Sequence, residues 1–252
     1  MPRLFISHEQ IEGSRLDLEG DGAHHLGSAL RVRPGEVLRV VDDRGEEHGV
    51  RVTAVRRGRV TGEVLWSRRA AGEPRLRVHV VQALIREMDQ VVATLAEVGA
   101  TAVHPVVTRR SVTRPDPERA DARLRHWREV ARAAAELAHR AAVPAVHPLT
   151  DLGRAVGELP ADVRLLACSL DAPAALARID PGAATTMALA VGPEGGLAPD
   201  ELAALAEAGA QAVHLGPRVL PAAHAGALAV GLLLARAGEL DAAAPPPPGT
   251  GP

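Results

Sequence analysis

The segment Val191-Gly192-Pro193-Glu194-Gly195-Gly196-Leu197 decides the predicted fold of this chain. It follows a run of only apolar residues, 187–191, which predicts a buried strand, and it precedes a predicted helix over 199–208. Its three glycines allow the backbone to come close to a ligand and to present N–H groups to it. Open α/β sheets bind ligands in loops at the C-terminal ends of their strands. The segment therefore predicts a small-molecule site, although a tight turn without a ligand would have the same composition.

A second loop follows the next predicted strand and has the sequence His214-Leu215-Gly216-Pro217-Arg218-Val219-Leu220. It also places Gly-Pro at the end of a strand. Loops that follow successive strands of a parallel sheet face one crevice. The first loop does not match the phosphate-binding patterns G-x-G-x-x-G or G-x-x-x-x-G-K-[ST]. The two loops together predict a ligand site of another kind.

From about residue 73 onward, predicted strands alternate with predicted helices. Apolar runs and helical spacing predict strands at 76–84, 102–107, 165–169, 187–191 and 211–215, and helices at 88–98, 117–142, 199–208 and 222–237. Gly99 stands where a glycine is expected just past a helix end, and Val143-Pro144 would end the long helix. This alternation predicts a mainly parallel sheet covered by helices.

Residues 1–72 follow a different pattern and predict a separate, small β-barrel domain. Short apolar runs at 37–41 and 50–55 alternate with turn signals such as Pro34-Gly35 and Arg57-Gly58, and 24–31 predicts a single helix. Residues 70–74 read as a linker to the second domain, predicted over 73–241. Residues 242–252 are rich in Ala, Pro and Gly, lack the material for a core and are predicted to be disordered.

The composition limits the classes of function. Hydrophobic residues make up 46% of the chain, but the aromatic ones are only Phe5, Trp66 and Trp127, which argues against single-strand binding by base stacking. All 29 basic residues are arginine. Residues 1–147 carry four more arginines than acidic residues, whereas residues 148–252 carry six fewer. The basic front part could meet phosphates, or it could be an ordinary solvated surface of mixed charge.

The single cysteine, Cys168, excludes an internal disulfide and any multi-cysteine metal site, and we expect no metal. Residues 1–7 are short and run straight into polar sequence, so we expect no secretion signal, and no apolar run reaches the roughly 18 residues of a membrane span. We therefore expect a soluble cytoplasmic protein.

In their order along the chain, these motifs resemble the RsmE family of methyltransferases, which belongs to the SPOUT superfamily. The most specific part is Gly-Pro-Glu-Gly-Gly at 192–196, followed after about twenty residues by Leu-Gly-Pro-Arg-Val-Leu at 215–220. The resemblance runs from Pro2 to about Leu240 and includes Pro2–Phe5, His25-Leu26, Leu30–Val32, Pro34–Glu36, Met88, Glu97–Gly99, Pro105, Arg110–Val112, Trp127, Glu136, Arg140 and Val143-Pro144.

This resemblance implies an α/β fold: a SPOUT-type catalytic domain with a C-terminal trefoil knot, preceded by a small PUA-like β-barrel that would bind RNA. It implies a homodimer whose active sites lie near the dimer interface. It also implies that S-adenosyl-L-methionine (SAM) binds in a bent pose, held largely by backbone groups of the two loops. The cofactor-binding residues that it implies are Leu170, Val191, Gly192, Pro193, Glu194, Gly195, Gly196, Leu215, Gly216, Val219 and Leu220.

The chain also departs from the family pattern, and the departures cluster. The family usually continues the second loop with Arg-Thr-Glu-Thr, whereas this chain has Pro221-Ala222-Ala223-His224. At the end of the long helix, Leu137 stands for the usual Gln and His139 for the usual Gly. The cofactor-side loops are therefore kept, while several polar groups on the presumed substrate side are not.

Proposed roles follow from the chemistry of methyl transfer to a uridine N3, whose proton must leave or whose anion must be stabilised. Arg218 is the candidate for stabilising negative charge, with a structural ion pair as the alternative. His224 is a possible base, because imidazole titrates near neutrality, with a polar residue at an altered helix start as the alternative. Candidate RNA contacts are Arg3, Arg31, Arg33, Arg109 and Arg110.

Three hypotheses remain open on sequence alone. The first is a SAM-dependent methyltransferase that modifies N3 of a uridine in 16S ribosomal RNA of the small subunit. The second is a SPOUT methyltransferase of the same build with a different acceptor, either another RNA or a small molecule. The third is a SAM-binding or RNA-binding module without turnover, against which the retained glycine-rich loops argue.

Overall fold

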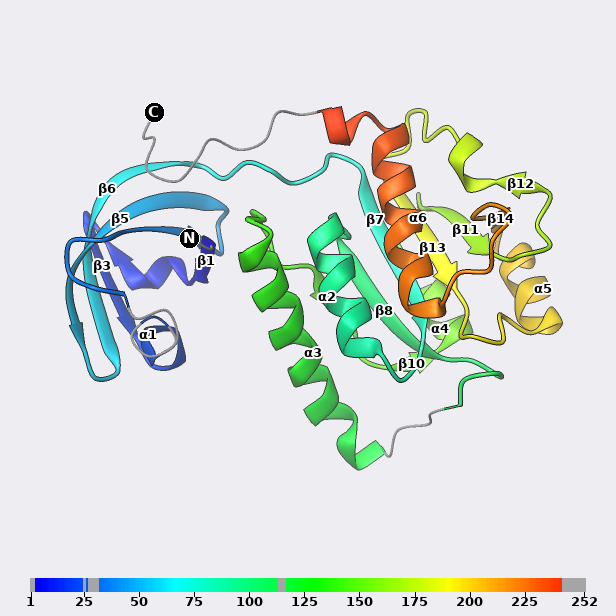
Figure 1. The fold of residues 1–252 in the computed structure, drawn as a ribbon, viewed down its shortest axis with the longest axis horizontal. Coiled ribbons are helices and arrows are strands. Elements are labelled where there is room, and N and C mark those ends of the chain that lie inside the picture. Colours follow the sequence, from blue (N-terminus) through cyan, green and yellow to red (C-terminus); the bar gives the residue numbers. More distant parts are fainter. Residues whose placement is uncertain (1–2, 25, 27–31, 113–116, 242–252) are drawn as a thin grey trace. The chain divides into compact units, whose positions relative to one another are not determined.

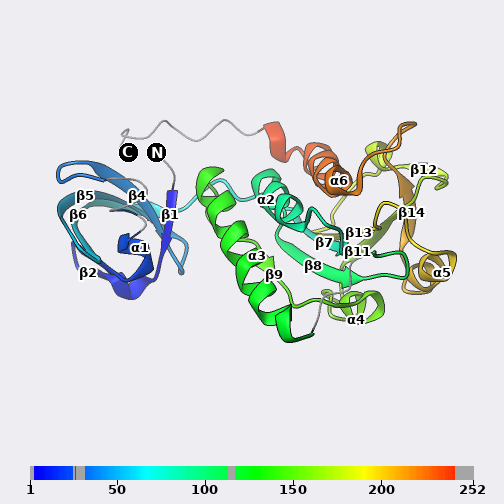
Figure 2. The ribbon, with the colours of Figure 1, turned by 60° about the horizontal axis from the view of Figure 1, so that its bottom comes forward.

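The computed structural model describes residues 3–24, 26, 32–112 and 117–241. Of these, residues 3–73 and 136–142 form one compact unit, and residues 74–135 and 143–241 form a second (Figures 1 and 2). The predicted disordered tail, 242–252, lies outside the described residues.

The first unit is built on a six-stranded sheet with the order β1-β4-β5-β6-β3-β2. Its strands are β1 (Arg3–Ile6), β2 (Ile11–Glu12), β3 (Arg15–Glu19), β4 (Val37–Asp42), β5 (Glu46–Arg56) and β6 (Arg59–Arg69). β1 pairs with β4 in parallel and the other pairs are antiparallel. Apolar side chains that alternate along these strands form a core of their own, because successive residues of a strand face opposite sides. The predicted β-domain is confirmed.

Two short helices accompany this sheet, η1 (His8–Gln10) and α1 (Asp21–His24). The helix that the sequence predicts over 24–31 therefore begins earlier, and most of its predicted length, residues 25 and 27–31, lies outside the described residues.

The second unit contains an eight-stranded sheet in which every pair is parallel. The order is β10-β8-β7-β13-β11-β14-β12, and β9 pairs with β8. The strands are β7 (Arg77–Ala83), β8 (Ala102–Val107), β9 (Ala145–Val146), β10 (Thr150–Asp151), β11 (Arg164–Cys168), β12 (Ala174–Ala175), β13 (Thr186–Val191) and β14 (Gln211–His214). The parallel sheet that the sequence predicts is confirmed.

Helices cover both faces of this sheet (Figure 1). They are α2 (Met88–Val98), α3 (Pro117–Leu137), α4 (Leu152–Gly157), η3 (Leu176–Arg178), α5 (Pro199–Glu207), α6 (Ala222–Arg236) and η4 (Glu239–Asp241). The central strand β13 shows how the two layers form. Met187, Leu189 and Val191 join the core beneath α2, α3 and α6, whereas Ala188 and Ala190 join the core beneath α4 and α5.

The end of α2 was predicted correctly, and the end of α3 was not. Gly99 caps α2 with φ +105°, in the left-handed conformation that a glycine adopts without strain, as predicted. The long helix was predicted to reach residue 142, but it ends at Leu137. His139 has φ +57°, which a right-handed helix cannot accommodate. The helix therefore stops before the Val143-Pro144 signal is reached.

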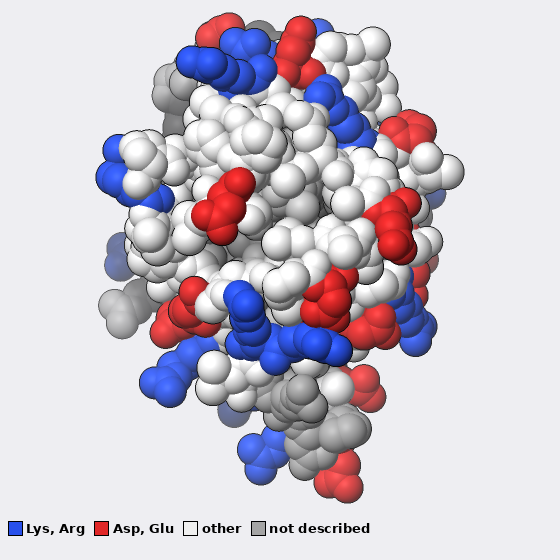
Figure 3. Space-filling view, turned by 90° about the vertical axis from the view of Figure 1, so that its right-hand side faces the viewer, with Lys and Arg blue, Asp and Glu red and all other residues white. Residues whose placement is uncertain are grey.

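No helix among the described residues is long and apolar enough to cross a membrane. On the face of the molecule that Figure 3 shows, the centre is largely free of charged side chains and is hollowed. Arg, Asp and Glu side chains lie mainly around the edge of that face.

Candidate functional site

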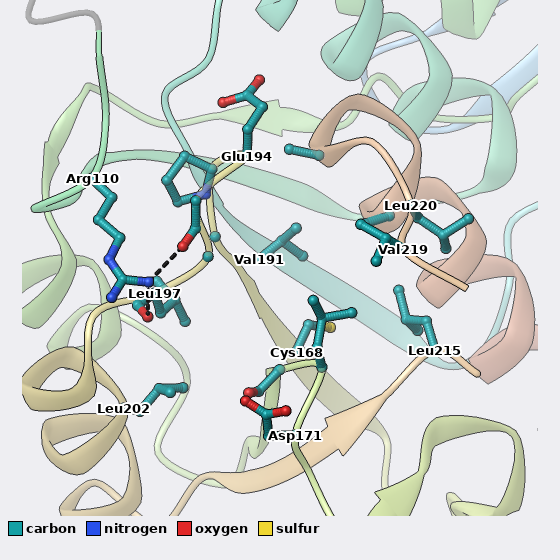
Figure 4. A pocket seen from close by; sticks show the side chains of 18 of the residues that line it. Arg110, Cys168, Asp171, Val191, Glu194, Leu197, Leu202, Leu215, Val219 and Leu220 are labelled. Atoms are coloured by element: carbon teal, nitrogen blue, oxygen red, sulfur yellow. Dashed lines mark hydrogen bonds between the residues drawn. The ribbon is translucent and has the colours of Figure 1, made fainter. Parts of the chain in front are cut away.

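The candidate site lies where three neighbouring strands of the second unit end. β13, β11 and β14 are adjacent and parallel, so their C-terminal ends meet at one edge of the sheet. The segments that leave these ends surround a cavity of about 370 Å³ (Figure 4). Ligand pockets in proteins commonly measure about 300–1,000 Å³. We call residues 192–197, after β13, the glycine loop and residues 215–221, after β14, the second loop.

Nearly all of the predicted cofactor-binding residues line this cavity. They are Leu170, Val191, Gly192, Pro193, Glu194, Gly195, Gly196, Leu215, Val219 and Leu220. The exception is Gly216, which does not line it. Gly216 has φ +101°, and its backbone N–H donates to Nδ1 of His214 at 3.1 Å, so it shapes the turn of the second loop.

The cavity has further lining residues that the sequence did not predict to bind the cofactor. They are Arg110, Cys168, Ser169, Asp171, Leu197, Pro199, Leu202, Ala222 and Ala225, together with Arg218, which was predicted for another role. Ser169 and Asp171 directly follow β11, so the rule that ligands bind at strand ends could have found them. The charged lining is balanced, with Arg110 and Arg218 against Asp171 and Glu194.

Backbone constraints fix the shape of the glycine loop. A Cβ on Gly192 would lie 2.7 Å from the backbone N of Leu197 and 2.8 Å from the carbonyl C of Gly196, closer than real Cβ atoms approach. Gly196 has φ +70°, and its N–H donates to the carbonyl of Pro193 at 2.8 Å. Gly195 is less restricted, because a Cβ there would meet only the side chain of Arg110, at 3.4 Å or more. Two of the three glycines are therefore required by the loop itself.

The segment that follows β8 contacts the glycine loop and the start of α5. Arg110 Nη1 donates to the carbonyl of Gly195 at 2.6 Å and to that of Leu197 at 3.5 Å (Figure 4). The backbone N–H of Arg109 donates to Oε1 of Glu201 at 2.8 Å, and its side chain pairs with Asp200 at 3.1 Å. Both arginines were predicted as RNA contacts, and Arg110 instead lies at the cavity.

The two predicted catalytic residues are separated. Arg218 is exposed, lines the cavity, and makes no hydrogen bond or ion pair with the described residues, so the structure shows no structural ion pair for it. His224 is exposed in the first turn of α6 and does not line the cavity. The cavity therefore includes Arg218 without His224.

The predicted RNA contacts of the first unit differ from one another in their exposure. Arg3 is only 1% exposed; its Nε lies 3.1 Å from the carboxylate of Glu47, and its Nη1 donates to the carbonyl of Ala71. A guanidinium buried in this way cannot meet an RNA phosphate at the surface, so this prediction is corrected. Arg33 is exposed, and Arg31 lies outside the described residues.

Cys168 lies at the cavity, but its chemistry is restricted. Burial raises the pKa of its thiol to about 12, so the thiol stays protonated at neutral pH and is a poor nucleophile. Among the residues that the structure describes, no cluster of three or more His, Cys, Asp or Glu side chains is arranged to hold a metal ion. Cys168 is therefore not a candidate nucleophile at neutral pH.

Comparison with known proteins identifies the family. Residues 72–234 match the model of an RNA methyltransferase domain, and residues 18–65 match an RNA methyltransferase PUA domain. The ribosomal RNA small subunit methyltransferase E of Mycobacterium bovis is 37% identical over 90% of this chain and 88% of its own length.

Solved structures are similar over nearly the whole chain. The protein of the same name from Neisseria gonorrhoeae, bound to S-adenosyl methionine, has a TM-score of 0.84 and 30% identity, covering 93% of this chain and 97% of its own. A methyltransferase from Legionella pneumophila in complex with SAM has a TM-score of 0.82 and 25% identity, covering 92% and 96%. The chain therefore belongs to the ribosomal RNA small subunit methyltransferase E family.

Proposed function

We propose that the protein is a SAM-dependent methyltransferase that methylates N3 of a uridine in 16S ribosomal RNA of the small subunit. The observation that carries the proposal is the cavity at the ends of β11, β13 and β14. Ten of the residues that line it are ones that the family resemblance implies for cofactor binding. Because so many of these residues surround one cavity, the alternative of a tight turn without a ligand is a poor explanation.

The lining suits a ligand that combines an apolar body with both signs of charge. Val191, Leu197 and Leu215 offer apolar surface, Asp171 and Glu194 offer carboxylates, and the loops offer backbone groups. SAM carries a sulfonium and an ammonium as well as a carboxylate, and when bound it supplies an electrophilic methyl group. What remains for the protein is alignment of the acceptor and stabilisation of charge.

Arg218 is the residue that we assign to charge stabilisation. Loss of the N3 proton leaves negative charge on the uracil ring, and a guanidinium donates hydrogen bonds in a fixed planar fork. Arg218 lines the cavity and is not engaged by described residues, so it can reach an acceptor without breaking an existing ion pair. His224 lies outside the lining, and we give it no part in proton transfer.

RNA binding would rest on exposed arginines of the first unit. The side chains of Arg33, Arg56 and Arg57 are exposed and make no hydrogen bond or ion pair with described side chains. By contrast, Arg51 pairs with Glu63 and Arg59 with Asp17. An unpaired arginine can neutralise a phosphate without first losing a partner, and such binding weakens steeply with salt.

We also propose a homodimer formed around the cavity end of the second unit. Leu170 and Val219 line the cavity and are 64% and 78% exposed, and Leu228 on α6 is 41% exposed. Large apolar side chains exposed at the cavity, as Leu170 and Val219 are, favour a covered surface, and interface centres are depleted of charge. Light scattering of the purified chain at micromolar concentration should report a dimer, and a monomer would contradict this.

We also propose that the protein acts in the cytoplasm, because its proposed substrate is ribosomal.

A different acceptor is the second candidate, and one observation favours it. Pro221-Ala222-Ala223-His224 replaces the polar residues usual in the family, and Ala222 lines the cavity. A polar acceptor site without its partners discriminates poorly.

The experiment that separates the two is transfer of labelled methyl groups from SAM to isolated small ribosomal subunits, at low and at physiological salt. The arginine pair Arg33→Ala/Arg57→Ala should reduce transfer and its salt dependence, while the ion-paired control Arg51→Ala should not. No transfer to any ribosomal particle, alongside intact SAM binding, would favour the other acceptor.

A further inference from the structure

Arg110, in the segment that follows β8, holds the glycine loop through two backbone carbonyls. Arg110 Nη1 donates to the carbonyl of Gly195 and, more weakly, to that of Leu197, so its two acceptors lie on either side of Gly196. Gly196 has φ +70°, a conformation that glycine can leave easily because it has no Cβ. A loop with three glycines has much conformational freedom to lose when it orders around a ligand.

The segment that carries Arg110 is itself firmly held. Thr108 and Ser111 are 3% and 8% exposed, and their hydroxyl oxygens lie 2.9 Å apart. The N–H of Thr108 donates to Oγ of Ser111, and the N–H of Ser111 donates to the carbonyl of Thr108. This closed turn fixes the backbone beside Arg110 at the end of β8.

A second connection runs from the same turn to the far end of the loop. One carboxylate oxygen of Glu201 accepts from the N–H of Arg109 at 2.8 Å, and the other accepts from the N–H of Ala198 at 2.8 Å. Ala198 caps α5, immediately after the glycine loop. The loop is therefore held to the turn after β8 at both its middle and its end.

We propose that Arg110 is a positioning residue for the cofactor: it orders the glycine loop in the ligand-binding shape before the ligand arrives. A guanidinium can do this because Nη1 carries two N–H donors, and both carbonyls lie within reach of that one nitrogen. This inference rests on the proposed function, since it assigns to SAM the cavity that the loop lines. It replaces the prediction that Arg110 contacts RNA.

Calorimetric titration of the full chain with SAM tests this proposal. Arg110→Ala should raise the dissociation constant for SAM about tenfold, within the range that a charge-assisted hydrogen bond contributes. Arg110→Lys should recover part of the affinity, because an ammonium keeps the charge and the donors but sits on a flexible stem and is held less firmly than the planar guanidinium. The matched control is Arg109→Ala, which removes only an exposed ion pair with Asp200 and should leave SAM binding unchanged.

Two ligands distinguish an action through the loop from direct contact with the ligand. S-adenosylhomocysteine keeps the amino-acid part of SAM, and 5′-methylthioadenosine lacks it. An action through the loop predicts that Arg110→Ala weakens both by a similar factor. A loss confined to S-adenosylhomocysteine would overturn the proposal, because Arg110 would then be binding the ligand carboxylate itself.

Two further readouts separate positioning from a role in folding. The unfolding temperature without ligand should be the same for Arg110→Ala and the wild type, and the KM for SAM should rise with kcat nearly unchanged at saturating SAM. Unchanged affinity in Arg110→Ala for every ligand would overturn the inference alone. If the wild-type protein binds no SAM, the proposed function fails first and this inference falls with it.

Discussion

The glycine loop and the second loop line the same cavity but are held in different ways. In the glycine loop, Gly196 bonds back to Pro193, Arg110 holds the carbonyl of Gly195, and a side chain on Gly192 would overlap the backbone. In the second loop, Arg218 and Val219 are exposed, and Arg218 has no hydrogen-bonding partner among the described residues.

This difference matches the pattern of kept and changed residues. The glycine loop keeps the family sequence, because its shape is set by contacts within this chain. The second loop is exposed at Arg218 and Val219; it keeps the family sequence over 215–220, and the chain departs from the family at Pro221–His224. We infer that the cofactor side is completed by the chain alone, whereas the acceptor side is completed by RNA or a partner subunit.

The largest expected effect is that of a methyl group on Gly192. Gly192→Ala places Cβ 2.7 Å from the backbone N of Leu197, and backbone cannot move aside as a flexible side chain can. We expect SAM affinity to fall by about 100-fold or more, since a loop rearrangement of about 3 kcal/mol suffices for this. The measurement is calorimetric titration with SAM.

Gly195→Ala is the matched control for this change, because its Cβ would meet only the flexible side chain of Arg110. We expect its SAM affinity to stay within about threefold of wild type, a free-energy change below about 0.7 kcal/mol. Equal losses in the two variants would mean that close approach of the ligand, and not the shape of the loop, selects these glycines.

The second effect concerns the open side of the cavity. Arg218→Ala should lower kcat for methyl transfer roughly 30-fold, somewhat below the loss of a preorganised donor in an enclosed site, and leave the KM for SAM unchanged. His224→Ala, on the same side but outside the cavity, should change kcat less than threefold, or about 0.7 kcal/mol. Steady-state kinetics with small ribosomal subunits measures both. A larger loss in His224→Ala would reverse the assignment.

The third effect tests whether the sheet below both loops is a fixed platform. His104 on β8 is 2% exposed; burial, with the nearby His147 and His79, lowers its pKa from 6.5 to about 3. Its ring lies parallel to that of His147, with centroids 4.0 Å apart.

Because the unfolded chain binds more protons than the folded one between these two pKa values, stability is complete above pH 6.5 and falls as the pH is lowered towards 3. One pH unit below 6.5 should cost about 1.4 kcal/mol from His104 alone. Urea denaturation at neutral and at acid pH measures this. His104→Gln should lose that share of the pH dependence, and an identical slope in both proteins would contradict the assignment.

The smallest effect concerns another position where the chain departs from the family. His139 occupies a left-handed conformation, φ +57°, where the family usually has a glycine. His139→Gly should relieve strain and stabilise the protein by about 0.5–1 kcal/mol. His139→Ala keeps the strain and serves as the control. A stability loss in His139→Gly in thermal unfolding would show that the imidazole makes contacts that outweigh the strain.

The sequence predicted those parts of the fold that depend on local pattern. β8 matches its predicted bounds, β13 begins one residue early, and α2 ends at its glycine, because apolar runs and caps are local signals. The end of α3 depends on the backbone of His139, which composition does not reveal. The short elements β10 and β12 have two residues each and carry no periodicity. The trefoil knot and the domain boundaries stay predictions.

The site was predictable where it depends on strand ends and not where it depends on distant contacts. The residues after β13 and β14 follow from the topology of parallel sheets. The role of Arg110 depends on carbonyls 85 and 87 residues away, and Arg3 reads like any other arginine until its contact with Glu47 is seen. Because all the basic residues of this chain are arginine, composition cannot distinguish an arginine that makes structural contacts from one that is free to bind RNA.

The most direct test of the central claim is SAM titration of the purified chain without RNA, at low and at physiological salt. If the cofactor side is completed by the chain alone, SAM should bind each chain once, with micromolar affinity and little dependence on salt. No detectable heat at millimolar SAM, or binding that appears only when ribosomal RNA is added, would contradict the claim.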